Sequence, residues 1–388
     1  MSRTAVDRND VQPDHPRIRS DHRVVRPDPA SAAPLRIDVP AGKTFVLIMR
    51  DDTAHCVREL SRRLTGGPAG PLGGPAPRTA LGPALAEAYR DFQRDTRDTL
   101  RDVMRPSGRL EFHLVDAHRL ELAVRGRAGH GPLISLDPLI ERAVRPLRVS
   151  RGFLLGGRTG VGLVVRPGAA SLVRQLAGLP DDPTRQGYTL IEDDVCTGET
   201  LREVIGLLRA TGRRVRQVVP GIRLDGTARP SILGATVAPV LQYRTVGAAG
   251  GAHAMELADP RNFLLGLSGL VVRLPDGGWG RAPYWLPFVS TAARIGTPDA
   301  SDEEFALRLL EANLRFFARA ERLVGRTVRV ADLHPATRRL LRSLEVAQGP
   351  EPVRAVLERL MADLDRLGEL IAELEERDAR LPAGSAVS

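Results

Sequence analysis

The sequence predicts an α/β protein with a parallel sheet, and three features support this prediction. Apolar strand patterns alternate with amphipathic helical patterns over residues 43–295. Residues 188–219 give a strand, a helix and a second strand, which is typical of a right-handed crossover between parallel strands. After residue 300 the helical period dominates. We therefore expect an N-terminal extension at residues 1–42, an α/β domain at 43–295 and a C-terminal helical region at 300–380.

The N-terminal extension is rich in charges and prolines and has no apolar periodicity. Such a composition predicts a disordered arm, so we expect ordered structure to begin at Thr44. No apolar stretch follows Met1, which argues against a secretory signal and favours the cytoplasm. The longest apolar runs are too short for a membrane span.

The first half of the α/β domain carries alternating strand and helix patterns around a Gly/Pro-rich loop at residues 66–78. A continuous apolar run predicts a buried strand, whereas alternation on both sides of a short turn predicts a hairpin. The expected elements are strands at 44–49 and 161–165, helices at 56–64, 83–104, 138–144 and 171–179, and a hairpin of 110–115 with 120–124.

The centre of the chain has the clearest local signals. A strand is expected at residues 188–191 and another at 215–219. Thr200 and Glu203 match a capping box, so Thr200 is the expected N-cap of the helix between these strands. Gly212 is suited to end that helix.

The C-terminal third begins with a strand and turn at residues 269–278 and an aromatic patch at 282–288. Helices are expected at residues 303–323, 335–347 and 353–377. The last helix carries a leucine stripe near coiled-coil spacing, which indicates a packing or dimer surface and leads us to expect a homodimer.

Composition argues against nucleic acid as the main partner, although the net charge is +9. Lys43 is the only lysine, and the arginines are interleaved with acids instead of forming one basic stripe. Aromatic residues make up only 4% of the chain, which leaves little surface for stacking bases. The two cysteines, Cys56 and Cys196, provide neither a disulfide framework nor a zinc-binding spacing.

The most informative motif is T-L-I-E-D-D-V-C-T-G-E-T at residues 189–200. Glu192, Asp193 and Asp194 follow the apolar strand, and a turn of small residues then opens a helix. Carboxylates at this position can accept hydrogen bonds from ribose hydroxyls or take a metal-bound sugar. Amides at the start of the helix can bind a phosphate. The simpler alternative is an acidic turn that only starts a helix.

Residues 190–200 resemble the phosphoribosyl-pyrophosphate motif of type I phosphoribosyltransferases. The resemblance extends over about 35 residues, through the helix and the following strand. It implies a phosphoribosyltransferase-like core that transfers 5-phosphoribose from phosphoribosyl pyrophosphate to a nitrogenous acceptor and releases pyrophosphate. It also implies that Mg²⁺ enters mainly on the pyrophosphate of the substrate. The sequence itself assigns no metal ligands.

The resemblance implies that Glu192 and Asp193 are the catalytic acids and face the ribose hydroxyls. The residues that would hold the 5′-phosphate are Cys196, Thr197, Gly198, Glu199 and Thr200. Two of these depart from the family pattern. Cys196 stands where some members carry an acid that acts as a base towards a purine, and the carboxylate of Glu199 repels a phosphate unless it points away.

The remaining site residues are candidates only. Those for pyrophosphate are Arg50, Arg158 and Arg166, and those for the acceptor are Arg281, Tyr284 and Trp285. For Arg50 the alternative is a solvated loop, and for the two aromatic residues it is the core. Cys196 is interpreted as a small residue and not as a nucleophile.

The leading interpretation is a phosphoribosyltransferase. A second interpretation is a non-catalytic sensor of a phosphoribosyl ligand that acts through the C-terminal helices. A third is an interaction protein in which the helical region alone binds the partner. The identity of the acceptor stays open at this point.

Overall fold

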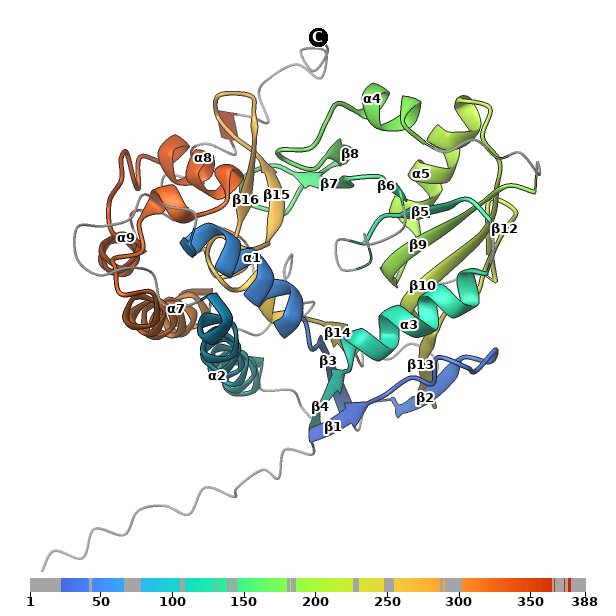
Figure 1. Cartoon of the computed structure of the whole chain (residues 1–388), viewed down its shortest axis with the longest axis horizontal. Helices are drawn as coiled ribbons and strands as arrows, with labels where there is room; N and C mark the ends of the chain where they lie inside the picture. Colours follow the sequence, from blue (N-terminus) through green and yellow to red (C-terminus); the bar gives the residue numbers. More distant parts are fainter. Residues whose placement is uncertain are drawn as a thin grey trace, which may run out of the picture.

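The computed structural model describes residues 22–41, 44–65, 78–104, 109–129, 131–137, 140, 145–179, 182, 186–225, 230–247, 255–286, 289, 302–364, 366, 373 and 376–377. Their strands form three sheets, in agreement with the expected α/β class. Figure 1 shows the sheet of β9 and β10 on one side of the molecule and the helices α7, α8 and α9 on the other, with α1 between them.

The first sheet is entirely parallel, in the order β1–β4–β3–β14. Its strands are β1 (His22–Val25), β4 (Arg109–Val115), β3 (Thr44–Arg50) and β14 (Met255–Leu257). The expected strand at 44–49 is confirmed as β3, which is buried over most of its length. The helices α1 (Thr53–Thr65) and α2 (Arg78–Met104) follow it, as predicted.

Ordered structure begins earlier than predicted. β1 pairs with β4, and β2 (Leu35–Pro40) pairs in parallel with β13 (Leu241–Val246). Val25 and Ile37 are buried, so this part of the supposed arm adds apolar side chains to the core. The strands were missed because each is short and bounded by prolines and charges.

The predicted hairpin at 110–124 is wrong. β4 is followed by a helix, α3 (Ala117–Ala128), and not by an antiparallel strand. Asp116 caps this helix, since its side chain accepts a hydrogen bond from the amide of Arg119 at 3.0 Å. Leu120, Ala123 and Val124 are buried at helical spacing, which explains the same residues without an alternating strand.

The second sheet carries the central motif. Its strands are β11 (Ser231–Ile232), β12 (Ala235–Val237), β10 (Val215–Asp225), β9 (Tyr188–Val195), β5 (Leu133–Ser135) and β6 (Arg145–Pro146), with β13 beside β10. β9 and β10 are parallel, and α5 (Glu199–Ala210) connects them. The predicted strand–helix–strand unit is therefore confirmed.

Two local details of this unit differ from the prediction. β9 does not end at Ile191 but continues through the three acids to Val195. The N-cap of α5 is Gly198, with φ of +72°, and not Thr200. The helix does end as expected, with Gly212 in a left-handed conformation at φ of +75°.

The third sheet has the order β16–β15–β7–β8. Its strands are β16 (Trp279–Ala282), β15 (Leu270–Arg273), β7 (Val149–Phe153) and β8 (Gly160–Val165). The predicted strands near 161–165 and 269–274 are confirmed, and so is the helix after β8, α4 (Leu172–Ala177).

The helices after residue 300 pack against the first two helices of the chain. They are α7 (Asp302–Val324), α8 (Pro335–Ser343) and α9 (Val353–Ala362), with the 3₁₀ turns η1 (Pro260–Asn262) and η2 (Val330–Asp332) nearby. One hydrophobic cluster includes residues of α1, α2 and all three of these helices. The rings of Phe92 on α2 and Phe316 on α7 meet edge to face at 5.9 Å.

The leucine stripe of the last helix is described only in part. Leu357, Leu360 and Leu364 are buried in the shared cluster. The rest of the stripe, at residues 367–371 and 374, lies outside the described residues, and so does most of the predicted helix at 138–144. No helix in the described part of the chain is long and apolar enough to cross a membrane.

A second hydrophobic cluster holds the first two sheets together. It joins Val46 and Ile48 of β3, Leu120 of α3, and Ile191 and Val219 of β9 and β10. Since all of these strands are parallel to their neighbours, the cluster fixes the carboxyl end of β3 relative to that of β9.

Candidate functional site

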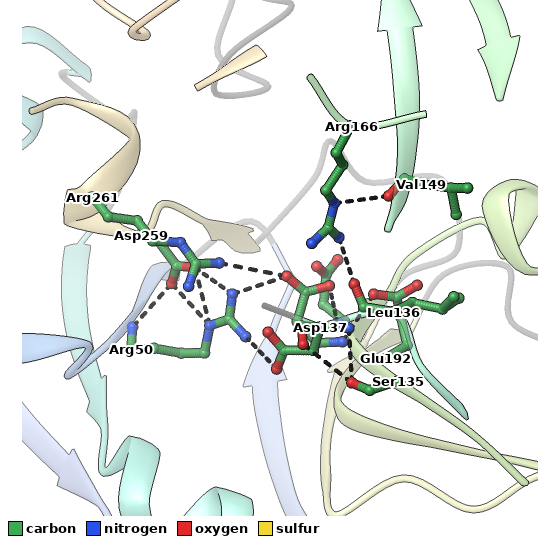
Figure 2. Close-up of polar contacts among 11 residues, drawn as sticks. Arg50, Ser135, Leu136, Asp137, Val149, Arg166, Glu192, Asp259 and Arg261 are labelled. Atoms are coloured by element: carbon green, nitrogen blue, oxygen red, sulfur yellow. Dashed lines mark hydrogen bonds and ion pairs between the residues drawn. The ribbon is translucent and has the colours of Figure 1, made fainter. Parts of the chain in front are cut away.

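The candidate site lies where the carboxyl ends of strands from two sheets meet around Arg50. Arg50 is the last residue of β3 and is only 1% exposed. Its Nε donates to both carboxylate oxygens of Asp259, at 3.1 and 3.0 Å. Its Nη2 donates to Asp193 Oδ2 at 2.9 Å, and its Nη1 reaches Asp137 Oδ2 at 3.4 Å. Figure 2 shows Arg50 between Asp259 and Asp137.

These contacts give Arg50 a structural role, and its contact with pyrophosphate stays a prediction. Burial alone would lower the pKa of Arg50, but Asp259, Asp193 and Asp137 raise it well above its ordinary value. The guanidinium is therefore charged and occupied by protein carboxylates. Its contact with Asp193 holds that carboxylate at the surface of the site.

The three consecutive acids of β9 have different environments. Burial opposes ionisation of Asp193, but Arg50 and then Arg261 hold its pKa well below the usual range. The pKa values of Glu192 and Asp194 are raised well above normal, first by burial and then by the charge of Asp193. The side chain of Asp193 is 23% exposed, whereas Glu192 is only 6% exposed. Asp193 is thus the ionised and more accessible acid, and Glu192 is the more buried of the two.

Arg261 and Asp52 complete the buried network. Arg261 Nη2 lies 3.0 Å from Asp259 Oδ2 and 3.7 Å from Asp193 Oδ2. Asp52 Oδ1 accepts a hydrogen bond from the hydroxyl of Tyr89 at 2.8 Å. Burial raises the pKa of Asp52 to about 6, although the charge of Arg261 opposes this shift.

Sequence reasoning missed Asp137, Asp259 and Arg261. Asp259 and Arg261 follow β14, a three-residue strand too short to give a periodic signal. Asp137 follows β5, another strand of three residues, where Ser135 Oγ accepts a hydrogen bond from its amide at 3.2 Å. A carboxylate directly after a short apolar run was the available signal in both places.

The predicted phosphate loop connects β9 to α5. Cys196 and Thr197 are exposed, and the described first turn of α5 has no side-chain cap. Gly198 is required here, because a Cβ would lie 2.8 Å from Ile232 Cδ1 and the residue has a positive φ. The amide of Glu199 donates only a long hydrogen bond, of 3.4 Å, to Thr197 Oγ1, and the positive end of the helix dipole favours an anion at this turn.

The two departures from the family pattern have local explanations. Glu199 forms an ion pair with Arg151 on β7, so its charge is neutralised beside the loop. The pKa of Cys196 is raised by burial and by Asp194. A raised pKa disfavours the thiolate, which agrees with Cys196 as a small loop residue instead of a nucleophile.

Of the other pyrophosphate candidates, Arg166 lies beside the acids and Arg158 does not contact them. Arg166 Nε donates to the carbonyl oxygen of Val149 at 2.8 Å, and its Nη2 donates to that of Leu136, next to Asp137 (Figure 2). Arg158 is exposed in the turn between β7 and β8.

The residues predicted to bind the acceptor differ in burial, and one of them belongs to the core. Trp285 is completely buried, and its indole N–H donates to the carbonyl oxygen of Phe263 at 2.8 Å, so it is a core residue. Tyr284 packs edge to face against the ring of Phe263 at 5.3 Å. Arg281 Nη1 donates to the carbonyl oxygen of Leu267 at 3.2 Å and remains partly exposed.

Among the described residues, no group of three His, Cys, Asp or Glu side chains is placed to hold a metal ion. The network around Arg50 uses its carboxylates in ion pairs instead. Comparisons of the chain with protein-family models, with curated proteins and with solved structures give no match.

Proposed function

We propose that this protein is a phosphoribosyltransferase-like enzyme. It transfers 5-phosphoribose from phosphoribosyl pyrophosphate to a nitrogenous acceptor and releases pyrophosphate. One observation carries the proposal: the partly exposed Asp193 on β9, whose pKa is lowered, is followed by a glycine turn and by the amino end of α5, where the N-cap residue Gly198 has no side-chain cap. A hydroxyl-binding carboxylate and a phosphate-binding turn are thereby joined within one short segment.

Asp193 has the main electrostatic role in this proposal. Displacement at C1 of the ribose develops positive charge on the sugar ring, and a fixed carboxylate stabilises that charge. Arg50 holds Asp193 Oδ2 at 2.9 Å, so the acid needs little reorganisation when the sugar binds. Glu192 helps to fix the backbone of Asp193, since Glu192 Oε1 accepts a hydrogen bond from the amide of Asp193 at 3.0 Å.

The 5′-phosphate is assigned to the loop from Cys196 to Thr200. The amides of the first turn of α5 supply donors, and the hydroxyls of Thr197 and Thr200 add two more. Mg²⁺ bound to the pyrophosphate would neutralise the leaving group. Arg166 is the arginine candidate for the same group, because it lies beside the acids on the far side from Arg50.

A non-catalytic phosphoribosyl-ligand sensor is the second candidate. One observation favours it: Glu192, which the resemblance assigns to the ribose hydroxyls, is only 6% exposed. The C-terminal helices could report binding, since Asn313 of α7 accepts a hydrogen bond from the amide of Leu265 at 2.9 Å and so fixes the segment after Arg261.

The test is calorimetric titration of the full chain with phosphoribosyl pyrophosphate and Mg²⁺, together with a pyrophosphate-release assay over a panel of nitrogenous bases. Asp193→Asn and Thr197→Val should each weaken binding at least tenfold. Asp95→Asn is the matched control, because Asp95 only pairs with Arg315 on the surface. Binding without release supports the sensor, and unchanged binding in both site variants contradicts both proposals.

A further inference from the structure

A second cluster of charged residues lies on the side of the site that faces the helices. Arg63 of α1 donates from Nη1 to the carbonyl oxygen of Gly266 at 2.6 Å. Arg281 of β16 donates to the next carbonyl along the chain, that of Leu267, at 3.2 Å. These two guanidiniums are therefore brought to the same turn by segments more than two hundred residues apart in sequence.

The cluster has more positive charge than the protein compensates. Arg63 Nη2 lies 3.3 Å from Glu59, and Arg261 is paired with Asp259. In contrast, no carboxylate in the described part of the chain lies within ion-pair distance of Arg281, and the Glu59 carboxylate that Arg63 contacts is shared with Arg62. Two guanidinium charges are thus left uncompensated in a partly buried region.

Arg261 adds unused donors. This residue is only 6% exposed, and its Nε and Nη1 are buried with no hydrogen-bond partner among the described residues. Its guanidinium extends from η1 towards the acids (Figure 2). A buried donor without a partner is costly, so these atoms indicate that a group absent from the chain itself completes the site.

His334 supplies one neutral donor to the same region. Its Nδ1 accepts a hydrogen bond from the amide of Ala336 at 3.1 Å, so Nε2 carries the ring proton. Burial, followed by Arg281 and Arg63, lowers the pKa of His334 to about 3. Burial, followed by Arg166, Arg63 and Arg261, lowers the pKa of Arg281 to about 10. The geometry agrees, because a Cβ at Gly266 would lie 2.7 Å from Leu333 Cδ2, so the residue before His334 packs against the turn that Arg63 and Arg281 contact.

We propose that Arg63, Arg261, Arg281 and His334 form a second binding site, for the phosphate group of a small molecule. Two uncompensated positive charges match the two negative charges of a phosphate monoester, whereas a carboxylate would neutralise only one. The site is separate from the loop at 196–200, which binds its phosphate through helix amides. None of its residues belongs to the β9–α5 motif, although Arg261 Nη2 also lies 3.7 Å from Asp193 Oδ2.

The experiment is titration of the full chain with sulfate at constant ionic strength, since sulfate stays dianionic over the working pH range. Arg281→Gln and Arg63→Gln should weaken sulfate binding at least tenfold, because each removes a charged donor. Arg281→Lys should restore part of it, and Arg342→Gln, an exposed arginine on α8, is the matched control. Acetate should not bind. Ribose 5-phosphate and inorganic phosphate then distinguish a phosphorylated small molecule from the free ion.

A second measurement separates binding from a purely structural role. Without an anion the arginines repel one another, so Arg281→Gln should leave the unfolding temperature unchanged or raise it, and should abolish the further rise caused by sulfate. The proposal is overturned if Arg281→Gln lowers the unfolding temperature and keeps the sulfate effect. It is also overturned if sulfate binding is lost only in Thr197→Val, a result that would leave the proposed function intact.

Discussion

Replacing Arg50 by methionine tests the buried network most severely. The change keeps most of the apolar stem and removes the guanidinium that contacts Asp259, Asp193 and Asp137. Removing one partner of a buried ion pair typically costs about 3–5 kcal/mol, because the other charge stays buried. Asp259 keeps Arg261 at 3.0 Å, and Asp193 is partly exposed, so we expect a loss of about 3–4 kcal/mol.

Urea unfolding at pH 7, followed by circular dichroism, measures this loss. Arg315→Met is the control, since Arg315 pairs with Asp95 on the surface, where the expected cost is below about 1 kcal/mol. The loss should also depend on pH. The pKa values of Asp193 and Asp259 are depressed in the folded state, so the stability that they contribute is present above their unfolded values near 3.8 and is lost as the pH falls towards the folded values. The difference between wild type and Arg50→Met should therefore shrink below pH 4. A loss under about 1 kcal/mol at pH 7, or a loss independent of pH, would refute this reasoning.

Three further changes probe the parts around this network. Asp52→Asn should stabilise the fold at pH 8 by up to about 3 kcal/mol and have little effect at pH 4. The pKa of Asp52 is raised from 3.8 to about 6 in the folded state, so the folded state loses stability as the pH rises between these values. Urea unfolding at both pH values measures the difference. Gly198→Ala should lower the free energy of unfolding by about 1–2 kcal/mol, because the residue has a positive φ. The new methyl group also crowds Ile232, so the double variant with Ile232→Val should recover part of the loss in an unfolding measurement. Asn313→Leu should cost about 2–3 kcal/mol, because the buried amide of Leu265 loses its acceptor, and its hydrogen exchange should accelerate.

Each of these three predictions has an outcome that would contradict it. Equal effects of Asp52→Asn at pH 4 and pH 8 would mean that this carboxyl is not the titrating group. Gly206→Ala is the control for Gly198, since its Cβ meets nothing within 4 Å and the change should stabilise α5 by about 0.5–1 kcal/mol. If both glycine variants behave alike, the turn is not constrained as described. For Asn313→Leu, unchanged exchange at Leu265 would exclude the proposed hydrogen bond.

The sequence predicted the fold best where strand patterns, helical periodicity and turn residues agree. The β9–α5–β10 unit was predicted because strand patterns at residues 188–191 and 215–219 flank a helix with one buried face, made of Leu201, Val204, Ile205 and Leu208. The segment at 120–124 was misread, because L-E-L-A-V also satisfies an alternating pattern. The N-cap at Asp116 was the signal that could have decided between the two.

The site was predicted only as far as one contiguous motif extends. Asp193 and the turn to α5 could be found because they are neighbours in sequence. The partners of Arg50 could not be predicted, because Asp259 lies 209 residues away and follows a strand of three residues. This contact depends on the parallel pairing of β3 with β14, two strands far apart in sequence, which local patterns do not encode.

The most direct test of the central claim is a crystal structure of the chain with phosphoribosyl pyrophosphate and Mg²⁺. We predict that the 5′-phosphate lies on the amides of Gly198, Glu199 and Thr200 and that the ribose hydroxyls donate to Asp193. A ligand bound only at the Arg63–Arg281 cluster, with the turn before α5 unoccupied, would contradict the account.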